Sequence, residues 1–130
     1  MVGSDKLTGK ELFGYKKLIA WQKANELARL IYSYTARFPK EEMFGLTSQL
    51  RRAGLSIPTN IVEGHARNNK KEFYRFLAIS LSSLAEVEYL LEFSYDLKYL
   101  SEAEFVKISG LREEVGHILW KLYISQRPAT

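Results

Sequence analysis

The chain has 130 residues, a length that suits one domain, and its 46% hydrophobic and 26% charged residues are ordinary globular values. It contains no cysteine, which excludes disulfides, thiolate metal sites and cysteine nucleophiles. The net charge of +4 is uneven: residues 1–75 carry 14 Lys/Arg and 7 Asp/Glu, residues 76–130 carry 5 and 8. Without a secretory signal or an apolar run of ~20 residues, we expect a cytoplasmic protein that does not contact membranes.

The N-terminal segment lacks apolar periodicity and contains three glycines. Residues 1–15 are therefore predicted to form a flexible tail, and residues 16–127 the folded domain. From residue 18 to residue 37, apolar side chains recur every three or four positions, which predicts the first helix. Pro39 ends it, because the residue before a proline is pushed out of the α region.

The second predicted helix spans residues 44–67 and has a proline in its interior. Pro58 lacks an N–H and crowds the carbonyl of Gly54, four residues earlier. Either the helix is kinked here or it breaks into two shorter pieces. Because the apolar stripe continues in phase across Pro58, we favour one helix with a kink.

The third predicted helix spans residues 70–97. Asn69 followed by Glu72 is typical of a capped helix start. Apolar and small residues then repeat every seven positions from Phe73 to Leu91, a pattern suited to helices that pack at a shallow angle. A second apolar flank indicates that this helix contacts more than one partner surface.

The fourth predicted helix begins with a capping box formed by Ser101 and Glu104. Its apolar stripe extends from Ile108 to Leu122. Four helices of about 20 residues with short connections predict an all-α fold, an antiparallel up-down-up-down four-helix bundle. Aromatic residues make up 13% of the chain, more than one narrow core holds. Some of them are therefore expected at a surface that another molecule covers.

No catalytic arrangement is recognisable in the sequence. His65 and His117 are the only histidines, and neither belongs to a zinc motif. The carboxylates of Glu88, Glu92 and Asp96 share one helix face, where solvent or a basic partner would stabilise them. The prediction is a protein that is not an enzyme, with no metal and no cofactor.

Basic residues give the clearest functional signal. Two arginines lie on the second helix, and further cations surround a tyrosine where the second and third helices meet. Phosphate contacts and stacking on an unpaired base would suit this set. The alternative is that Arg51 pairs within the chain and solvent surrounds the rest. The candidate nucleic-acid-binding residues are Arg51, Arg52, Arg67, Lys70, Lys71, Tyr74 and Arg75.

Four segments resemble a known bacterial family of four-helix bundles, the proteins encoded in intervening sequences of 23S ribosomal RNA genes. The accessory protein of diversity-generating retroelements is similar to this family as well. The resemblance covers about residues 15–123 and departs from the family pattern at His65–Ala66 and at Asn69. The segments that carry it are Leu18–Ala24, Phe38–Ala53, Ser56–Gly64 and Lys71–Leu77.

The resemblance implies a homo-oligomeric ring, a pentamer, with a basic surface. For the retroelement branch it also implies contact with nucleic acid and a reverse transcriptase. It gives Pro58 and Gly64 a role in shaping the second helix and its corner. Asn60 and Glu63 would be polar ties to a neighbouring helix or subunit.

Two functions of different classes follow. The first is a non-catalytic, ring-forming accessory factor that binds RNA or DNA through its basic surface. The second is a scaffold that docks another protein through aromatic anchors and never binds nucleic acid. An enzyme with an unfamiliar site is the third and least supported interpretation.

Overall fold

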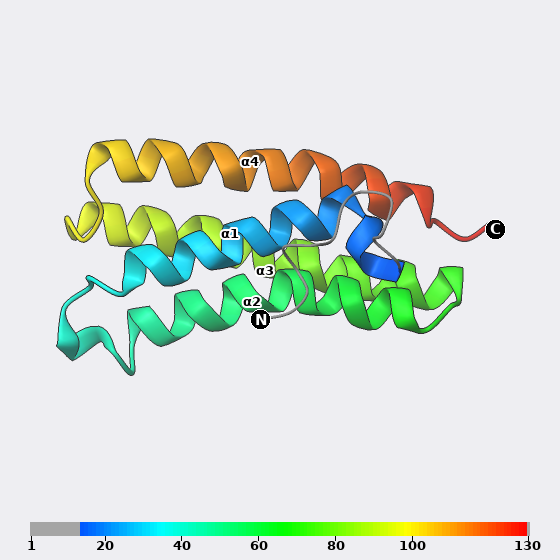
Figure 1. Ribbon diagram of the computed structural model, residues 1–130, viewed down its shortest axis with the longest axis horizontal. Coiled ribbons are helices and arrows are strands. Elements are labelled where there is room, and N and C mark those ends of the chain that lie inside the picture. Colours follow the sequence, from blue (N-terminus) through cyan, green and yellow to red (C-terminus); the bar gives the residue numbers. More distant parts are fainter. Residues whose placement is uncertain (1–13, 130) are drawn as a thin grey trace, which may run out of the picture.

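The computed structural model describes residues 14–129, which form four long α-helices and two short 3-10 helices (Figure 1). Within this range there is no β-strand. Of the predicted tail, residues 1–13 lie outside the described residues, and Gly14 and Tyr15 belong to the first 3-10 helix. The elements are η3 (Gly14–Lys17), α1 (Ile19–Thr35), η4 (Lys40–Glu42), α2 (Leu46–Ala66), α3 (Lys70–Asp96) and α4 (Glu102–Ser125).

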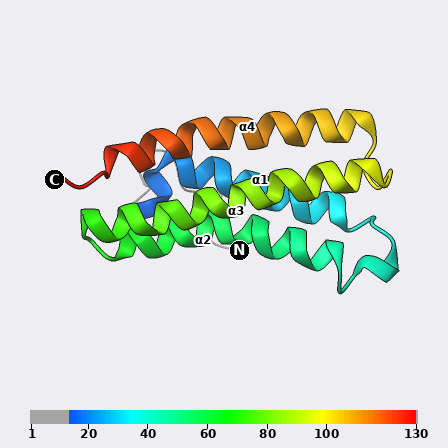
Figure 2. The same ribbon diagram turned by 180° about the vertical axis from the view of Figure 1, so that it is seen from behind.

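The helices run alternately up and down (Figures 1 and 2). Helices that follow each other in sequence pack together, and α1 also packs against α4, so the four helices form a closed square. The α1–α4 seam therefore lies on the opposite side of the bundle from the α2–α3 seam. The predicted antiparallel four-helix bundle is confirmed.

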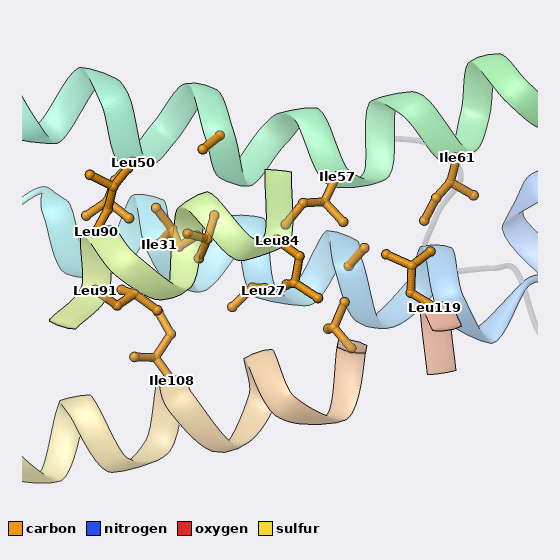
Figure 3. Packing of buried hydrophobic residues seen from close by; sticks show 14 of the residues in the cluster. Leu27, Ile31, Leu50, Ile57, Ile61, Leu84, Leu90, Leu91, Ile108 and Leu119 are labelled. Carbon is orange, nitrogen blue, oxygen red and sulfur yellow. The ribbon is translucent and has the colours of Figure 1, made fainter. Parts of the chain in front are cut away.

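The core is a column of aliphatic side chains along the bundle axis (Figure 3). These residues come from the apolar stripes of all four helices, so the helical periodicity of the sequence identified them correctly. Fully buried members include Leu27, Ile57, Leu77, Val87 and Leu119.

The second helix is continuous across its proline, so the alternative of two shorter pieces is wrong; the kink at Pro58 stays a prediction. Side-chain donors supplement the backbone hydrogen bonds around the ring. Thr59 Oγ1 donates to the Leu55 carbonyl at 2.7 Å, and Ser80 Oγ of α3 donates to the Ile57 carbonyl at 2.9 Å. The neighbouring helix thus stabilises the segment that proline weakens.

Two glycines of α2 permit close contact with its neighbours. A Cβ atom at Gly54 would lie 2.6 Å from Ile31 Cδ1 of α1. At Gly64 it would lie 2.7 Å from Phe76 Cβ and 2.8 Å from Phe73 Cδ1, both on α3. The α2–α3 seam is therefore so close at Gly64 that any side chain would force the helices apart.

The two glycines of α4 differ from each other. A Cβ at Gly116 would meet Leu84 Cδ2 of α3 at 3.4 Å, an ordinary van der Waals contact. At Gly110 a Cβ would meet nothing within 4 Å. Gly110 instead leaves open space on the surface of α4.

Both predicted helix starts are confirmed. Asn69 Oδ1 accepts the Glu72 N–H at 2.9 Å. Ser101 and Glu104 form a complete capping box, and the Glu104 carboxylate also pairs with Arg37 at the end of α1. These contacts join the α3–α4 turn to the α1–η4 connection.

The first helix ends two residues earlier, and the second begins two residues later, than the sequence predicts. Thr35 Oγ1 donates to the Ile31 carbonyl at 2.7 Å and ends α1. The Glu42 carboxylate accepts the Leu46 N–H at 3.1 Å and the Tyr99 hydroxyl at 3.0 Å, so it caps the start of α2. That carboxylate raises the pKa of Tyr99, because the hydroxyl must stay protonated to donate.

Gly64→Ala is expected to destabilise the fold by about 1–3 kcal/mol, because its Cβ collides with the Cβ of Phe76 near the α3 backbone. Gly116→Ala is the matched control in a helix with room, and it should gain up to about 1 kcal/mol from helix propensity. Urea unfolding measures both. Equal effects of the two substitutions would contradict the close packing at Gly64.

Glu104→Gln tests the tie between the two connections at one end of the bundle. Hydrogen bonding from the Ser101 backbone, followed by Arg37, lowers the pKa of Glu104 below its usual 4.5. The carboxylate therefore stabilises the fold above this pH, and the contribution disappears as the pH falls through the lowered pKa. We expect a loss of about 1 kcal/mol in urea unfolding at pH 7 and a smaller loss at pH 3. An equal loss at both pH values, or an equal loss for the control Glu102→Gln, would be contrary to this account.

Candidate nucleic-acid interface

The candidate basic residues fall into two separate groups. Arg51 and Arg52 lie in the first half of α2, whereas Arg67 follows its last residue. Sixteen positions of helix correspond to about 24 Å along the axis. The two arginines therefore do not belong to the cluster at the α2–α3 corner.

The side chain of Arg51 is used inside the fold. Its Nε donates to Thr35 Oγ1 at 2.9 Å, and its guanidinium lies 4.6 Å from the centre of the Tyr32 ring. A terminal nitrogen also donates to the Tyr32 carbonyl at 3.4 Å. Arg51 thus places a cation at the C-terminal end of α1, where the helix dipole favours positive charge. Arg51 forms no salt bridge among the described residues, but these hydrogen bonds and the ring contact hold its side chain against α1.

The neighbouring Arg52 is exposed and lines a shallow groove of about 820 Å³ over the outer face of α2. The Ser56 and Ser83 hydroxyls join α2 to α3 in this groove at 2.8 Å. Asn60 Nδ2 donates to the Ser56 carbonyl at 2.9 Å and to its hydroxyl at 3.0 Å. Asn60 is therefore tied to α3 through Ser56, whereas Glu63 is exposed and forms no ion pair among the described residues.

At the α2–α3 corner, two arginines stack on one phenylalanine. The guanidinium of Arg67 lies 5.0 Å, and that of Arg75 4.7 Å, from the centre of the Phe76 ring. Arg75 also pairs with Glu72 at 3.0 Å, and this hydrogen bond lowers the pKa of Glu72. The stacking fixes both guanidinium groups over an apolar base while their outer edges face solvent.

Tyr74 is less available than the sequence suggests. Its ring stacks on Tyr123 of α4 with centroids 4.3 Å apart and planes within 9°. The Tyr123 hydroxyl lowers the pKa of Tyr74, with a smaller effect from Arg127. Because one face of the Tyr74 ring is already covered, stacking on a nucleic-acid base would have to use the other face.

Sequence reasoning missed cations that other segments bring to the same end. The η3 helix packs on α1 and α2, and a Cβ at Gly14 would lie 3.9 Å from the His65 ring. Residues 14–22, 59–80 and 118–129 form this end of the bundle and hold eight Lys/Arg against two Asp/Glu, a difference of +6. We call these eight residues the basic end: Lys16, Lys17, Arg67, Lys70, Lys71, Arg75, Lys121 and Arg127.

The remaining described residues have the opposite balance. Residues 23–58 and 81–117 hold nine Lys/Arg and eleven Asp/Glu, a difference of −2. The far end carries Glu41, Glu92, Asp96 and Glu102, all of them exposed. Charge is therefore separated along the bundle axis.

The described part of the chain offers no other recognisable chemistry. Residues 14–129 contain no group of three or more His or carboxylate side chains placed to hold a metal ion. Among the helices described, none is both long and apolar enough to cross a membrane. The His65 and Phe73 rings pack in a T-shaped arrangement, with ring centroids 5.9 Å apart.

Comparisons with known proteins agree with the fold. The family model described as 23S rRNA-intervening sequence protein matches residues 16–121. A crystal structure from Bacteroides thetaiotaomicron, described as a protein of unknown function from the S23 ribosomal protein family, is 25% identical with a TM-score of 0.73. The similarity covers 81% of this chain and 95% of that one. No curated protein matches the sequence.

Arg51→Ala and Arg52→Ala separate the structural arginine from the exposed one. Arg51→Ala should lower the free energy of unfolding by about 1–2 kcal/mol, because it removes charged hydrogen bonds at the end of α1. Arg52→Ala should change it by less than about 0.5 kcal/mol. Urea unfolding distinguishes them, and equal effects would show that the Arg51 contacts contribute nothing.

Proposed function

We propose, because the chain belongs to the 23S rRNA-intervening sequence protein family, that it is a non-catalytic, oligomeric helical bundle that binds RNA or DNA. The binding surface is the basic end, and the partner group is the phosphate backbone. The cytoplasm, where RNA and DNA are accessible, is the proposed location.

One observation carries this proposal: eight cations against two carboxylates at one end of the bundle. They come from η3, the α2–α3 corner and the end of α4, so the fold gathers them from distant parts of the chain. Such a patch attracts a polyanion and gains free energy when condensed counterions are released.

The start of α3 strengthens this patch. Lys70 and Lys71 are its first residues, both exposed, and Asn69 caps the helix. The N-terminal end of a long helix carries a partial positive charge that favours phosphate. Arg67 and Arg75, held on Phe76, present guanidinium groups next to these lysines.

The arrangement favours binding without sequence selectivity. Phosphate contacts position a protein on nucleic acid, whereas base contacts provide the specificity. Tyr74 has one ring face on Tyr123, and Phe76, on the same helix, lies beneath two arginines. We therefore assign affinity to the cations and little discrimination among bases.

Assembly into a homo-oligomer, a pentameric ring as the resemblance implies, is part of the proposal. Several large apolar side chains remain exposed on the single chain, among them Phe44, Tyr89, Phe93, Val106 and Trp120. Several copies would present several basic ends to one polyanion and raise the overall affinity.

A scaffold that docks another protein is the second candidate. The exposed aromatic residues Phe44, Tyr89 and Phe93 favour it, because aromatic anchors dominate protein interfaces. Such a complex would depend little on salt, whereas nucleic-acid binding depends on it strongly.

Lys70→Glu/Lys71→Glu tests the basic end against a control of equal charge. Lys40→Glu/Lys98→Glu changes two exposed lysines of the opposite end, so both variants have a formal net charge of 0 instead of +4. Affinity for duplex DNA and for a structured RNA is measured by fluorescence anisotropy from 50 to 200 mM salt. The Lys70/Lys71 variant should bind at least about tenfold more weakly, with a log–log salt slope reduced by about 2.

The control variant should retain most of the wild-type affinity and slope. Equal losses in both variants would mean that only net charge matters and that the basic end is not the site. No binding by the wild-type protein at 50 mM salt would reject nucleic acid and leave the protein scaffold.

A further inference from the structure

Phe44 is 96% exposed and lies in the connection between η4 and α2. The next residue, Gly45, lines a shallow hollow of about 340 Å³ together with Tyr89 and Phe93 of α3. Met43 is also exposed. Gly45 thus connects the exposed pair before it to the exposed pair on α3, at one end of the α2–α3 seam. We call these four side chains the Phe44 knob: Met43, Phe44, Tyr89 and Phe93.

The α1–α4 seam carries a hollow that is not filled by the chain itself. This groove measures about 620 Å³, and Leu30, Val106 and Leu111 supply its apolar wall. Gly110 also lines it, and a Cβ at that position would meet nothing within 4 Å. The groove therefore has space for side chains from outside the chain.

The knob and the groove lie on opposite sides of the bundle, because the α2–α3 and α1–α4 seams face away from each other. The knob of a chain therefore cannot reach the groove of the same chain. In a pair of copies, the knob of one can contact the groove of the next, which is a head-to-tail contact. Such a contact leaves a knob and a groove free at the two ends, so further copies add until the rotation between them closes a ring, or an open filament forms.

Charges on the two surfaces are complementary. Two carboxylates line the groove, and both pair with Lys23 beside it, whose Nζ lies 3.5 Å from Glu26 and 3.5 Å from Glu114, so one positive charge offsets part of their two negative charges. Arg29 and Lys107 also line the groove, are exposed and form no ion pair among the described residues.

Beside the knob the sign is reversed. Glu86, Glu92 and Asp96 lie on α3 close in sequence to Tyr89 and Phe93, and within residues 14–129 none of them forms an ion pair. A groove with two free cations therefore suits a knob flanked by three free carboxylates.

We infer that the Phe44 knob of one copy inserts into the α1–α4 groove of a second copy, over Gly110, and that this contact builds the oligomer. The inference rests on the assembly part of the proposed function and names the two surfaces that meet. Burial of the knob removes from water the most exposed aromatic side chain of the described chain.

Two variants test the two surfaces separately. Phe44→Ser removes the anchor of the knob, and Gly110→Leu fills the groove. Neither should disturb the fold, because Phe44 is exposed and a side chain at Gly110 meets no atom of its own chain. Multi-angle light scattering after gel filtration should give an oligomer for the wild type and a monomer for each variant. Leu55→Ser, an exposed residue of α2 outside both surfaces, is the control and should remain oligomeric.

Mixing the two variants gives the sharpest result. Each keeps one intact surface, so the mixture should form a 1:1 heterodimer and nothing larger, even though each variant alone is a monomer. An interface between two identical patches would behave differently. Phe44→Ser would dissociate, Gly110→Leu would stay oligomeric, and mixing would have no effect.

Oligomeric Phe44→Ser or Gly110→Leu would overturn this interface while the assembly itself stands. A monomeric wild-type protein would reject the assembly and the interface together. Neither result depends on nucleic acid, because all masses are measured without it, so failure here is distinguishable from failure of RNA or DNA binding.

Discussion

The close contact of α2 with its two neighbours is the constraint on which the rest of the structure depends. Gly54 and Gly64 supply the absent side chains, and Ser80 supplies a hydroxyl for a backbone carbonyl beside Pro58. Because α2 lies this close to α3, a short turn connects them. The cations in and beside this turn therefore lie together at the basic end. The same packing leaves the outer face of α2 free, so the exposed residues of this helix lie on a rigid surface.

Charge separation follows from topology and not from the order of charges in the sequence. The basic end combines residues near 16, near 70 and near 127, because an antiparallel bundle brings the start of its first helix next to the end of its last. Acidic residues of α3 and α4 collect toward the other end. The imbalance between the two halves of the sequence indicated a positive field but not its position.

The fold was predictable because its signals are local. The apolar stripes, the Asn69 and Ser101 caps and the lengths of the connections each act within a few residues. The site was only partly predictable, because tertiary neighbours decide which side chains are free. Arg51 is used by the end of α1, and Tyr74 is stacked on Tyr123. The open surface at Gly110 likewise depends on which side chains of other helices lie near it, and the spacing of apolar residues along one helix does not predict this.

The separation of the two ends also has a length scale. The 27 residues of α3 make it about 40 Å long, several times the screening length of about 8 Å at physiological ionic strength. A polyanion at the basic end therefore does not feel the carboxylates of the other end. At physiological salt the two ends therefore interact with other molecules independently. Lowering the salt concentration lengthens the screening distance, so a polyanion would then be attracted by the basic end and repelled by the acidic end, and the bundle would be oriented before contact.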